Sequence, residues 1–515
     1  MASLLTRYAD RIEGVLSCFD RLLISGTLVE ICHAAVATSF VKRSHIKIFE
    51  FEERFAKPIR DEIRERAEAL AQENGLSVEF IRRRSFRKED KVQKILEKRG
   101  DHPGLVHVFS ALEAHPGYRP WFDKKHNVAY LLPRQGQCLH YYFYFIHEEL
   151  GLCHLRVPTW APFRVQFMMN GHGWLARRLE REGIGFTLVD NAFLAIDDLD
   201  RAQEIADELT GKRLHRLLDR LVKRYCPFLP RFIKGYHWSI AQAELATDVL
   251  FRRREDLAPI YDHLLRAAIH AVKADDVASF LGKKLTPGYT GEVQSDLRLR
   301  IQGRRIRHQM GPVSVKMYDK RGLVLRIETT TNNVSFFKHY RQVEHRDGTV
   351  DTKYAEMKKT IHSLGALAEV MGTSNRRYLA YVSDLEDPTP GLKSLDRITR
   401  TVREKGRRYS GFNLFDKEHL GLFRILARGE YTISGFRNKD LRAHLPHWSS
   451  SRVSRFLKRL RLHGLIKKVR NTYKYYLTVL GRRAITTGLK LRELVVIPAM
   501  VPVPQGSGQD CCQVA

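Results

Sequence analysis

A stretch near residue 320 places a tyrosine among cations and carboxylates in a pattern typical of paired β-strands. In VSVKMYDKRGLVLRIETTTNN, residues 313–333, apolar and polar side chains alternate on both sides of a tight loop at 320–322. Alternation with a period of two predicts strands, and the loop between them predicts a hairpin. The polar residues expected to share one face are Lys316, Tyr318, Arg326 and Glu328.

The loop sets which residues of the hairpin stand opposite one another. If Asp319 faces Leu323, the other facing pairs follow as Tyr318 with Val324, Lys316 with Arg326 and Ser314 with Glu328. In this register the tyrosine, the two cations and the glutamate are neighbours.

Such a face has the groups needed to break a phosphodiester. Cations beside a tyrosine lower the pKa of the phenol and hold a phosphate, so the phenolate can attack phosphorus. On this interpretation Tyr318, Lys316 and Arg326 are catalytic, and Asp319 and Glu328 bind Mg²⁺ or Mn²⁺. The alternative is an ordinary amphipathic hairpin with a charged outer face.

The hairpin, with the preceding GRRIRHQMG, resembles the tyrosine-bearing YDK and LRIE strands of plasmid and phage rolling-circle replication initiators. The resemblance implies nicking of one DNA strand through a covalent tyrosine intermediate. It is confined to this short segment. The His-apolar-His motif of the common nickases is absent, since 139–141 and 153–155 each supply one histidine.

The last hundred residues have a second pattern, in which helices precede a basic hairpin. Asp416 can cap a first helix, followed by a short strand-like segment at 431–433. Ser434 can cap a second helix. Ser449 or Ser450 can cap a third helix that ends at Gly464. Two strands with a turn at 470–472 follow.

The third helix separates an apolar stripe from a basic face. Its apolar stripe consists of Val453, Phe456, Leu457 and Leu460. A helix that enters the major groove needs such a core face and exposed donors for bases and phosphates. The residues expected to bind DNA, on this helix and the following hairpin, are Arg452, Ser454, Arg455, Lys458, Arg459, Lys467, Lys468, Arg470 and Lys474.

This order of elements resembles the winged helix-turn-helix domains of MarR- and ArsR-type bacterial regulators. The resemblance implies that 412–497 is a winged helix that binds DNA. A winged helix used for protein contacts alone is the alternative, and RNA or single-stranded DNA stays open as a partner.

The charge of the chain also favours a polyanionic partner. The formal net charge is +30 and the pI is about 9.9. Residues 401–500 hold 23 Lys plus Arg and 6 Asp plus Glu, so this fifth of the chain has a net charge of +17. Nucleic acid is the leading partner for such an excess, and an acidic membrane surface is the second.

Neither a signal peptide nor a membrane-spanning run is expected from the sequence. The seven cysteines show no zinc-ligand spacing and no disulfide framework. We therefore expect a reduced, cytoplasmic, bacterial protein without a membrane partner.

The expected architecture is an α/β or α+β body followed by the winged helix. The expected segments are a mostly helical basic region at 1–102, a mixed α/β core at 103–395, a linker at 396–411, the winged helix at 412–497 and a disordered tail at 498–515. Residues 198–285, including WSIAQAELATDVLF, are expected to be helical. The aromatic strand 140–146 is expected to pack on both sides, with base stacking as the alternative.

Three weaker features could join the hairpin. Residues 170–173, Asn-Gly-His-Gly, predict a turn and a helix start, with His172 as an acid–base candidate. The acidic residues that could share a metal with the hairpin are Asp190, Asp197 and Asp198. His147-Glu148-Glu149 is expected to be a solvated turn.

Together these features predict a DNA-binding protein whose winged helix targets a larger nucleic-acid-handling body, associated with a mobile element or with regulation. The alternative function is a rolling-circle-type initiator, nickase or strand transferase with Tyr318 as the nucleophile and a divalent metal.

Overall fold

The computed structural model describes residues 2–500, apart from 84, 287–288, 301–302, 346, 387, 414–415, 471 and 498–499. It divides the chain into two compact units, Met1–Glu386 and Asp387–Ala515. Nearly all of the tail expected from the sequence, including 501–515, lies outside the described residues.

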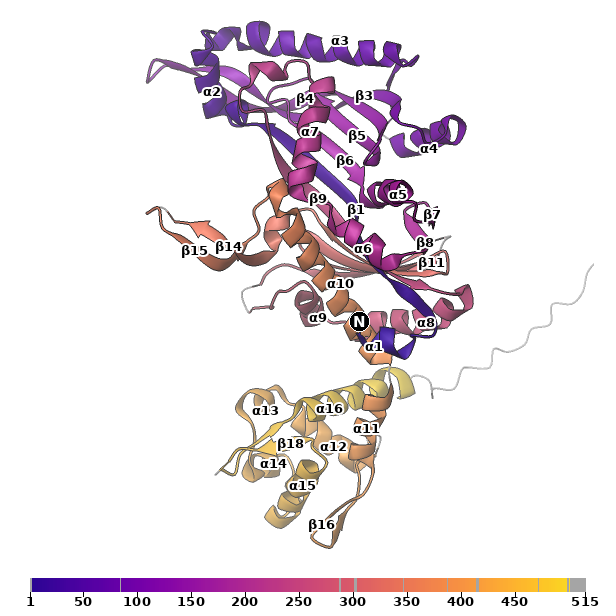
Figure 1. Cartoon of the computed structure of the whole chain (residues 1–515). Helices are drawn as coiled ribbons and strands as arrows, with labels where there is room; N and C mark the ends of the chain where they lie inside the picture. The colour runs from indigo at the N-terminus through magenta and orange to yellow at the C-terminus, as the bar shows by residue number, and fades with distance from the viewer. Residues whose placement is uncertain are drawn as a thin grey trace, which may run out of the picture. The chain divides into compact units, whose positions relative to one another are not determined.

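The first unit is built on one large sheet (Figure 1). Among the described residues, eleven strands form it in the order β10-β11-β12-β13-β9-β1-β6-β5-β4-β3-β2. Neighbouring strands are antiparallel except β2 and β3. The strands are β1 Ile12–Leu28, β2 Val78–Phe80, β3 Gly104–Asp123, β4 Val128–His147, β5 Gly151–Pro158, β6 Val165–Asn170, β9 Tyr236–Phe251, β10 Val293–Arg300, β11 Gly303–Met310, β12 Val313–Lys320 and β13 Val324–Thr331.

Helices and two small hairpins complete the first unit. The helices are α1 Ala2–Arg7, α2 Ala34–Arg43, α3 Lys57–Glu73, α4 Lys88–Arg99, α5 Gly171–Glu182, α6 Leu199–Asp207, α7 Gly211–Tyr225, α8 Arg254–Ala271, α9 Ala274–Phe280 and α10 Leu364–Glu386. The hairpins are β7 Phe186–Val189 with β8 Ala192–Ile196, and β14 Lys338–Glu344 with β15 Val350–Glu356.

The middle of the sheet is covered on both faces. On one face, Asn375 of α10 donates a hydrogen bond to Thr247 of β9. On the other face lie the start of α5 and the β7–β8 turn, which reach Asp20 of β1 through His172 and Asn191. A mixed α/β body is thus confirmed, and its central strands β13, β9 and β1 are shielded from solvent.

Two expectations for the first unit are wrong. Residues 1–102 do not form a region of their own, because β1 lies at the centre of the sheet between β6 and β9. The segment WSIAQAELATDVLF is strand β9, not a helix. Strand β9 is buried on both faces from Leu245 to Phe251, so its apolar residues there lack the alternation that identifies a strand.

The hairpin at 313–331 forms, but its register differs by two residues from the expected one. Asp319 faces Leu325, Tyr318 faces Arg326 and Lys316 faces Glu328. The loop is Arg321-Gly322-Leu323, because Arg321 and Gly322 take positive φ angles of 58° and 74°. The Gly322 amide donates to Asp319 Oδ1 at 2.7 Å and closes this turn. A shift of two residues keeps every side chain on its face.

The second unit is smaller and has its own core. Its elements are α11 Pro388–Thr399, β16 Val402–Glu404, β17 Arg407–Tyr409, α12 Lys417–Leu426, α13 Gly429–Ser434, α14 Asn438–Ala443, α15 Ser450–Leu462, β18 Ile466–Lys468, β19 Tyr475–Leu477 and α16 Val479–Leu491. The four apolar residues expected on the inner stripe of α15 are all buried. Ser449 caps α15 by accepting a hydrogen bond from the Arg452 amide.

Two details of the second unit differ from expectation. Residues 396–411 are not a free linker, because Ile398 belongs to the core and β16 pairs with β17. The segment 431–433 is helical, within α13, rather than strand-like. Tyr431 is buried against Phe436 and its hydroxyl donates to the Asp440 carbonyl, so packing overrides a weak local preference.

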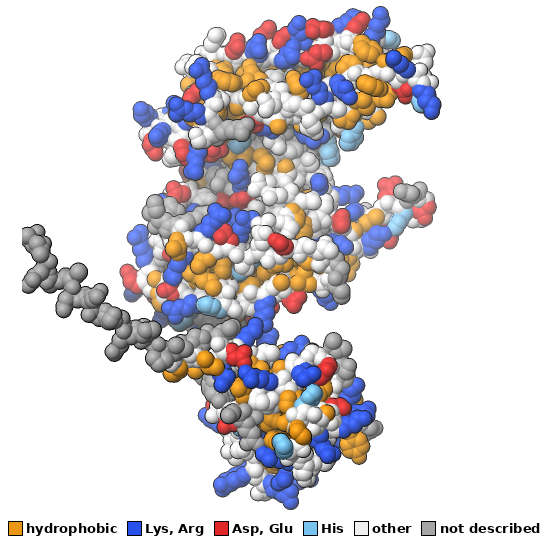
Figure 2. Space-filling view, turned by 180° about the vertical axis from the view of Figure 1, so that it is seen from behind, with side chains coloured by type: hydrophobic (Ala, Val, Ile, Leu, Met, Phe, Trp, Pro, Cys, Tyr) orange, Lys and Arg blue, Asp and Glu red, His pale blue; other side chains and the backbone are white. Residues whose placement is uncertain are grey.

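None of the described helices combines the length and apolar character that a membrane span requires. On the face seen in Figure 2, Lys and Arg side chains outnumber Asp and Glu over the second unit.

Candidate metal centre

Three carboxylates from neighbouring strands converge near the middle of the sheet. They belong to Asp20 of β1, Glu244 of β9 and Glu328 of β13, and one oxygen of each lies within 4.8 Å of the other two. The β1–β9 pairing is irregular between Phe19 and Arg21, which leaves Asp20 without a cross-strand partner. Bulges of this kind redirect side chains and are frequent beside active sites.

The spacing of these oxygens fits one hard cation. Mg²⁺ takes oxygen ligands at about 2.0–2.1 Å, so two of its ligands lie at most about 4.2 Å apart. The carboxylates therefore need only a small contraction to share an ion. Asp20 and Glu328 are buried and Glu244 is half-buried, so a bound ion would have limited exposure.

A cavity of about 220 Å³ opens onto these carboxylates. Lys316 and Tyr318 of β12 line it, and both contact Glu328. Lys316 Nζ lies 2.5 Å from Glu328 Oε1, and the Tyr318 hydroxyl donates to Glu328 Oε2. Substrate entering the cavity would thus meet a cation, a phenol and three carboxylates.

The three carboxylates differ in how their charge is compensated. Burial and the neighbouring charge of Glu328 raise the pKa of Glu244. Burial also acts on Asp20, but the hydrogen bond and charge of His172 and the charge of Arg326 outweigh it, so the pKa of Asp20 lies below its ordinary value. Glu244 is therefore the carboxylate with the greatest need for an added cation.

A buried network of charged and polar side chains contacts Asp20. Arg326 is fully buried and forms two hydrogen bonds of 2.6 Å to the carboxylate of Asp248. His172 lies between the two acids, with Nδ1 3.2 Å from Asp20 Oδ1 and Nε2 3.8 Å from Asp248 Oδ2. The Asn191 side chain donates to Asp20 at 2.7 Å. These contacts fix the orientation of Asp20 toward the cavity.

The network also sets protonation states. Burial and Arg326 lower the pKa of His172, but the hydrogen bonds to Asp20 and Asp248 outweigh them and the pKa is raised. For Asp248, burial raises the pKa, and the charge of Arg326 reverses that effect and lowers it. Arg326 also donates to His172 Nε2 at 3.1 Å, so its guanidinium links the imidazole to Asp248 beneath the cavity.

The structure brings together some of the residues expected to be functional and separates others. Lys316, Tyr318 and Glu328 meet at the cavity. Arg326 lies on the expected face but does not line the cavity, so it positions Asp20 and Asp248. Asp319 reaches the cavity edge, yet its carboxylate accepts from the Gly322 amide and lies outside the three-carboxylate cluster.

The weaker acidic candidates do not join the cluster. Asp190 pairs with Arg321 at the surface, and Asp198 caps α6 by accepting from the Arg201 amide. The Asp197 amide donates to the Gly185 carbonyl in the β7–β8 sheet. In contrast, His172 is part of the network, while Asn170 caps α5 as the turn-and-helix interpretation expects.

Sequence reasoning missed Asp20, Glu244 and Asp248. Each is an acidic residue within a long apolar run, VLSCFDRLLISG in β1 and AELATDVLF in β9. Acidic side chains are seldom buried unless they are paired or bind a metal, so such interruptions were the available signal.

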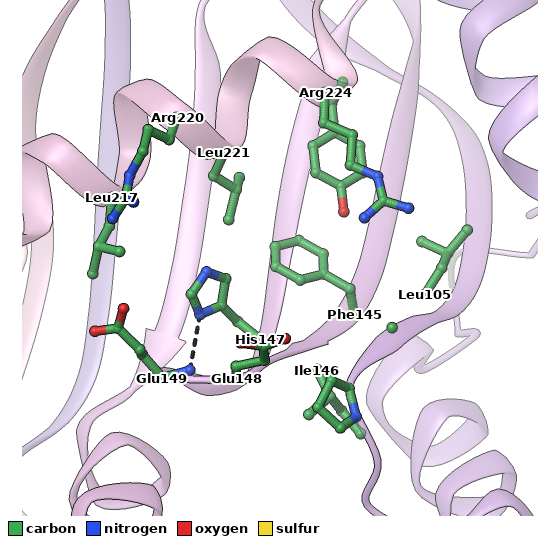
Figure 3. A pocket seen from close by; sticks show the side chains of 13 residues that line it. Leu105, Phe145, Ile146, His147, Glu148, Glu149, Leu217, Arg220, Leu221 and Arg224 are labelled. Carbon is green, nitrogen blue, oxygen red and sulfur yellow. Dashed lines mark hydrogen bonds between the residues drawn. The ribbon is translucent and has the colours of Figure 1, made fainter.

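A larger cavity, of about 590 Å³, lies between α7 and the edge of β3 and β4 (Figure 3). His147, Glu148 and Glu149 line it together with Arg220 and Arg224. The Glu149 amide donates to His147 Nδ1, and its carboxylate pairs with Arg213. These contacts are those of a turn, and no three ligand atoms converge in the described part of this cavity.

The aromatic strand packs on both sides. Residues 141–146 of β4 are all buried, which confirms the packed-strand interpretation over a base-stacking face. The hydroxyls of Tyr142 and Tyr144 donate to Glu113 and Glu89.

The residues expected to bind DNA fall into two groups. Those exposed on α15 and the hairpin are Arg452, Ser454, Arg455, Lys467, Lys468 and Arg470, and Lys474 is half-buried. Lys458 instead pairs with Glu404 at 2.7 Å. Arg459 donates to the carbonyls of Ser410 and Gly411. Both are half-buried and hold the β16–β17 segment.

Comparison of the chain with protein-family models, curated proteins and solved structures found no match. The resemblances to winged-helix regulators and to replication initiators therefore enter below as proposals.

Proposed function

We propose that this chain is a divalent-metal-dependent enzyme that cleaves nucleic-acid phosphodiesters, and that its second unit is a winged helix that binds DNA. The observation that carries the enzymatic part is the convergence of Asp20, Glu244 and Glu328 on one cavity. An oxygen-only ligand set of this kind suits Mg²⁺ or Mn²⁺, the ions used to bind phosphate oxygens.

The residues around the carboxylates suit a phosphate substrate. A bound ion would supply Lewis-acid activation of the phosphodiester and of a water. Lys316 and Lys320 line the cavity and place positive charge where a phosphate would enter. Glu328 is within hydrogen-bond reach of both Lys316 and Tyr318, so it can accept a proton during attack on phosphorus.

Tyr318 supports a second candidate function, a nickase that forms a covalent tyrosine adduct. Its hydroxyl donates to a carboxylate, which is the arrangement of a nucleophile beside its base. Burial and the charge of Glu328 raise the pKa of Tyr318 well above its ordinary value, however. A phenolate would therefore need an added cation, and water is the nucleophile that the charges favour.

A cleavage assay separates the two candidates. Supercoiled and labelled single-stranded DNA are incubated with the full chain and Mn²⁺ or Mg²⁺, and denaturing gels report nicks and protein–DNA adducts. We expect metal-dependent cleavage without an adduct, and we expect Tyr318→Phe to keep at least a tenth of the rate. An adduct that disappears in Tyr318→Phe would establish the covalent mechanism, and absence of cleavage with every metal would overturn both.

The proposal for the second unit rests on its exposed cations. Arg452 and Arg455 lie in the N-terminal half of α15, and Lys467 and Lys468 lie on the following strand. All four are exposed, while the opposite side of α15 packs in the core. A helix of this kind inserts its exposed half into the major groove, and the hairpin meets the neighbouring phosphates.

Removal of two of these cations should weaken DNA binding and its salt dependence. For Arg455→Ala with Lys468→Ala, we expect a roughly 10-fold loss of affinity, and a fall of about 2 in the slope of log K against log salt concentration. Fluorescence anisotropy over a salt series measures both quantities. Lys42→Ala with Arg43→Ala removes the same charge from the exposed end of α2 and is the control. Equal effects of the two pairs would mean that overall charge, not α15, governs binding.

A further inference from the structure

A second cluster of ligand-type side chains lies far along the sheet from the carboxylates. It consists of His115 on β3 and of Cys138 and His140 on β4. One ligand atom from each lies within 4.8 Å of the others, and all three residues are at least nine-tenths buried. Cys138 and His140 are two residues apart on β4, and His115 of β3 faces Gly136, two residues before Cys138, so all three side chains project from one face of the sheet.

Both imidazoles have a nitrogen without a partner. His140 Nδ1 lies 3.0 Å from the Cys138 carbonyl oxygen, so Nδ1 carries the proton and donates it. Nε2 of His140 is then a free lone pair, and Nε2 of His115 also makes no hydrogen bond. A buried polar atom without a partner costs free energy, so two of them beside a thiol call for a ligand.

We propose that His115, Cys138 and His140 form a zinc site, with Nε2 of each histidine and the sulfur of Cys138 as the ligands. Two imidazoles and one thiolate form a ligand set that Zn²⁺ prefers, with a water in the fourth position of a tetrahedron. On binding, the thiol proton leaves to solvent and the zinc–sulfur bond forms. The carbonyl of Cys138 then acts on His140 as the outer hydrogen-bond partner that orients a metal-bound imidazole.

The ligand spacing is compatible with this assignment. Zinc bonds of about 2.0–2.1 Å to nitrogen and 2.3 Å to sulfur place tetrahedral ligands roughly 3.3–3.6 Å apart. Cys138 Sγ lies 3.9 Å from Nδ1 of His140 rather than from its Nε2, and the imidazole rings of His115 and His140 have centroids 5.2 Å apart. Coordination through Nε2 therefore requires the His140 ring to turn its Nε2 edge toward Sγ, a side-chain movement that leaves the strand pairing of β3 and β4 unchanged.

The surroundings hold the imidazoles in the form that binds metal. Burial, together with the charge of Arg156, lowers the pKa of His115 to about 4 and that of His140 to about 3. Both rings are therefore neutral near pH 7. Burial raises the pKa of Cys138, although hydrogen bonds from Thr159 and Trp160 oppose that shift.

Cobalt substitution tests the site without an activity assay. The purified full chain is dialysed against a chelator and then titrated with Co²⁺, whose thiolate charge-transfer band reports a cobalt–sulfur bond. We expect the charge-transfer band to saturate at one equivalent of Co²⁺ per chain and to disappear when Zn²⁺ displaces the cobalt. We also expect the intense visible bands of a tetrahedral ion. Oxygen-only coordination at Asp20, Glu244 and Glu328 gives no charge-transfer band, so the two sites are distinguished.

Three variants complete the test. Cys138→Ser should abolish the band, and His115→Gln should weaken Co²⁺ binding by at least about 10-fold while the thiol remains. Cys153→Ser, at a buried cysteine that packs in the main core, should leave the band unchanged. Circular dichroism verifies that each variant is folded. A wild-type chain without the band, or a band retained in Cys138→Ser, would overturn the proposal.

Discussion

Glu244→Gln should abolish metal-dependent cleavage while the chain stays at least as stable as the wild type. Burial and the charge of Glu328 raise the pKa of Glu244, so its carboxylate is held in an unfavourable place in the metal-free protein. A neutral amide of the same size removes the repulsion from Glu328. It also removes a metal ligand, and loss of a group that merely supports a ligand already costs about 10–100-fold. We therefore expect a loss of at least about 100-fold in cleavage rate.

The measurement combines cleavage with thermal unfolding. In the wild type, Mn²⁺ should raise the Tm because it binds the folded state alone, and in Glu244→Gln this increase should disappear. Asp190→Asn is the matched control, since Asp190 is an exposed carboxylate one residue before Asn191 and pairs with Arg321. Cleavage that survives in Glu244→Gln, or a Tm response to Mn²⁺ that is unchanged, would remove Glu244 from the metal centre.

Part of the candidate site could be predicted because it lies within one local element. The hairpin β12–β13 is predicted by the alternation of apolar and polar residues and by a glycine in its loop. The shared face of Lys316, Tyr318 and Glu328 therefore follows from the sequence. The register could not be fixed, because a loop at 320–322 and one at 321–323 satisfy the same alternation. The polar face was still predicted correctly, because a shift of two residues leaves each side chain on the same face of the hairpin.

The other half of the site could not be predicted in the same way. Asp20 and Glu244 come from strands more than 200 residues apart, and their pairing is a property of the whole sheet. The sequence of β9 contains three alanines and two leucines, which favour helices locally, and burial of the strand on both faces hides its period. The bulge that frees Asp20 has no sequence signal at all.

The second unit followed local rules more closely. Caps and apolar spacing gave the third helix within one residue, because Ser449 and the stripe ending at Leu460 are features of the helix itself. The partners of Lys458 and Arg459 were not predictable, since Glu404 and Ser410 lie in a segment expected to be a linker. A basic helix face that is predicted from residue spacing alone therefore includes cations, such as Lys458 and Arg459, that make contacts within the fold.

The network of Arg326, His172, Asp20 and Asp248 explains how the three acids of the candidate metal centre can be accommodated in a folded sheet. Charges removed from water are costly unless they are paired and hydrogen-bonded. Asp20 and Asp248 meet that condition through Arg326 and His172, so two of the four acids in this part of the sheet, Asp20, Asp248, Glu328 and the half-buried Glu244, are compensated without a metal. Glu328 has Lys316, and Glu244 is left as the group that a metal would neutralise.

Arg326→Met should destabilise the chain by about 3–5 kcal/mol, the range for breaking a buried ion pair from one side. Methionine fills much of the volume of the arginine but leaves the carboxylate of Asp248, which is 1% exposed, without its two hydrogen bonds. Urea unfolding of the full chain, followed in the transition of the first unit, measures the loss. Arg321→Met is the control, because its pair with Asp190 is exposed and should be worth about 0–1 kcal/mol.

A second substitution tests whether the loss of stability comes from the buried charge of Asp248 that is left without its partner. In the double variant Arg326→Met with Asp248→Leu, both partners are apolar, and replacement of a whole buried pair is often close to neutral. We therefore expect the double variant to regain much of the stability that Arg326→Met loses. If Arg326→Met instead keeps wild-type stability and loses cleavage, Arg326 contacts the substrate, as its position beside Tyr318 on the hairpin first indicated, and does not act through Asp20 and Asp248.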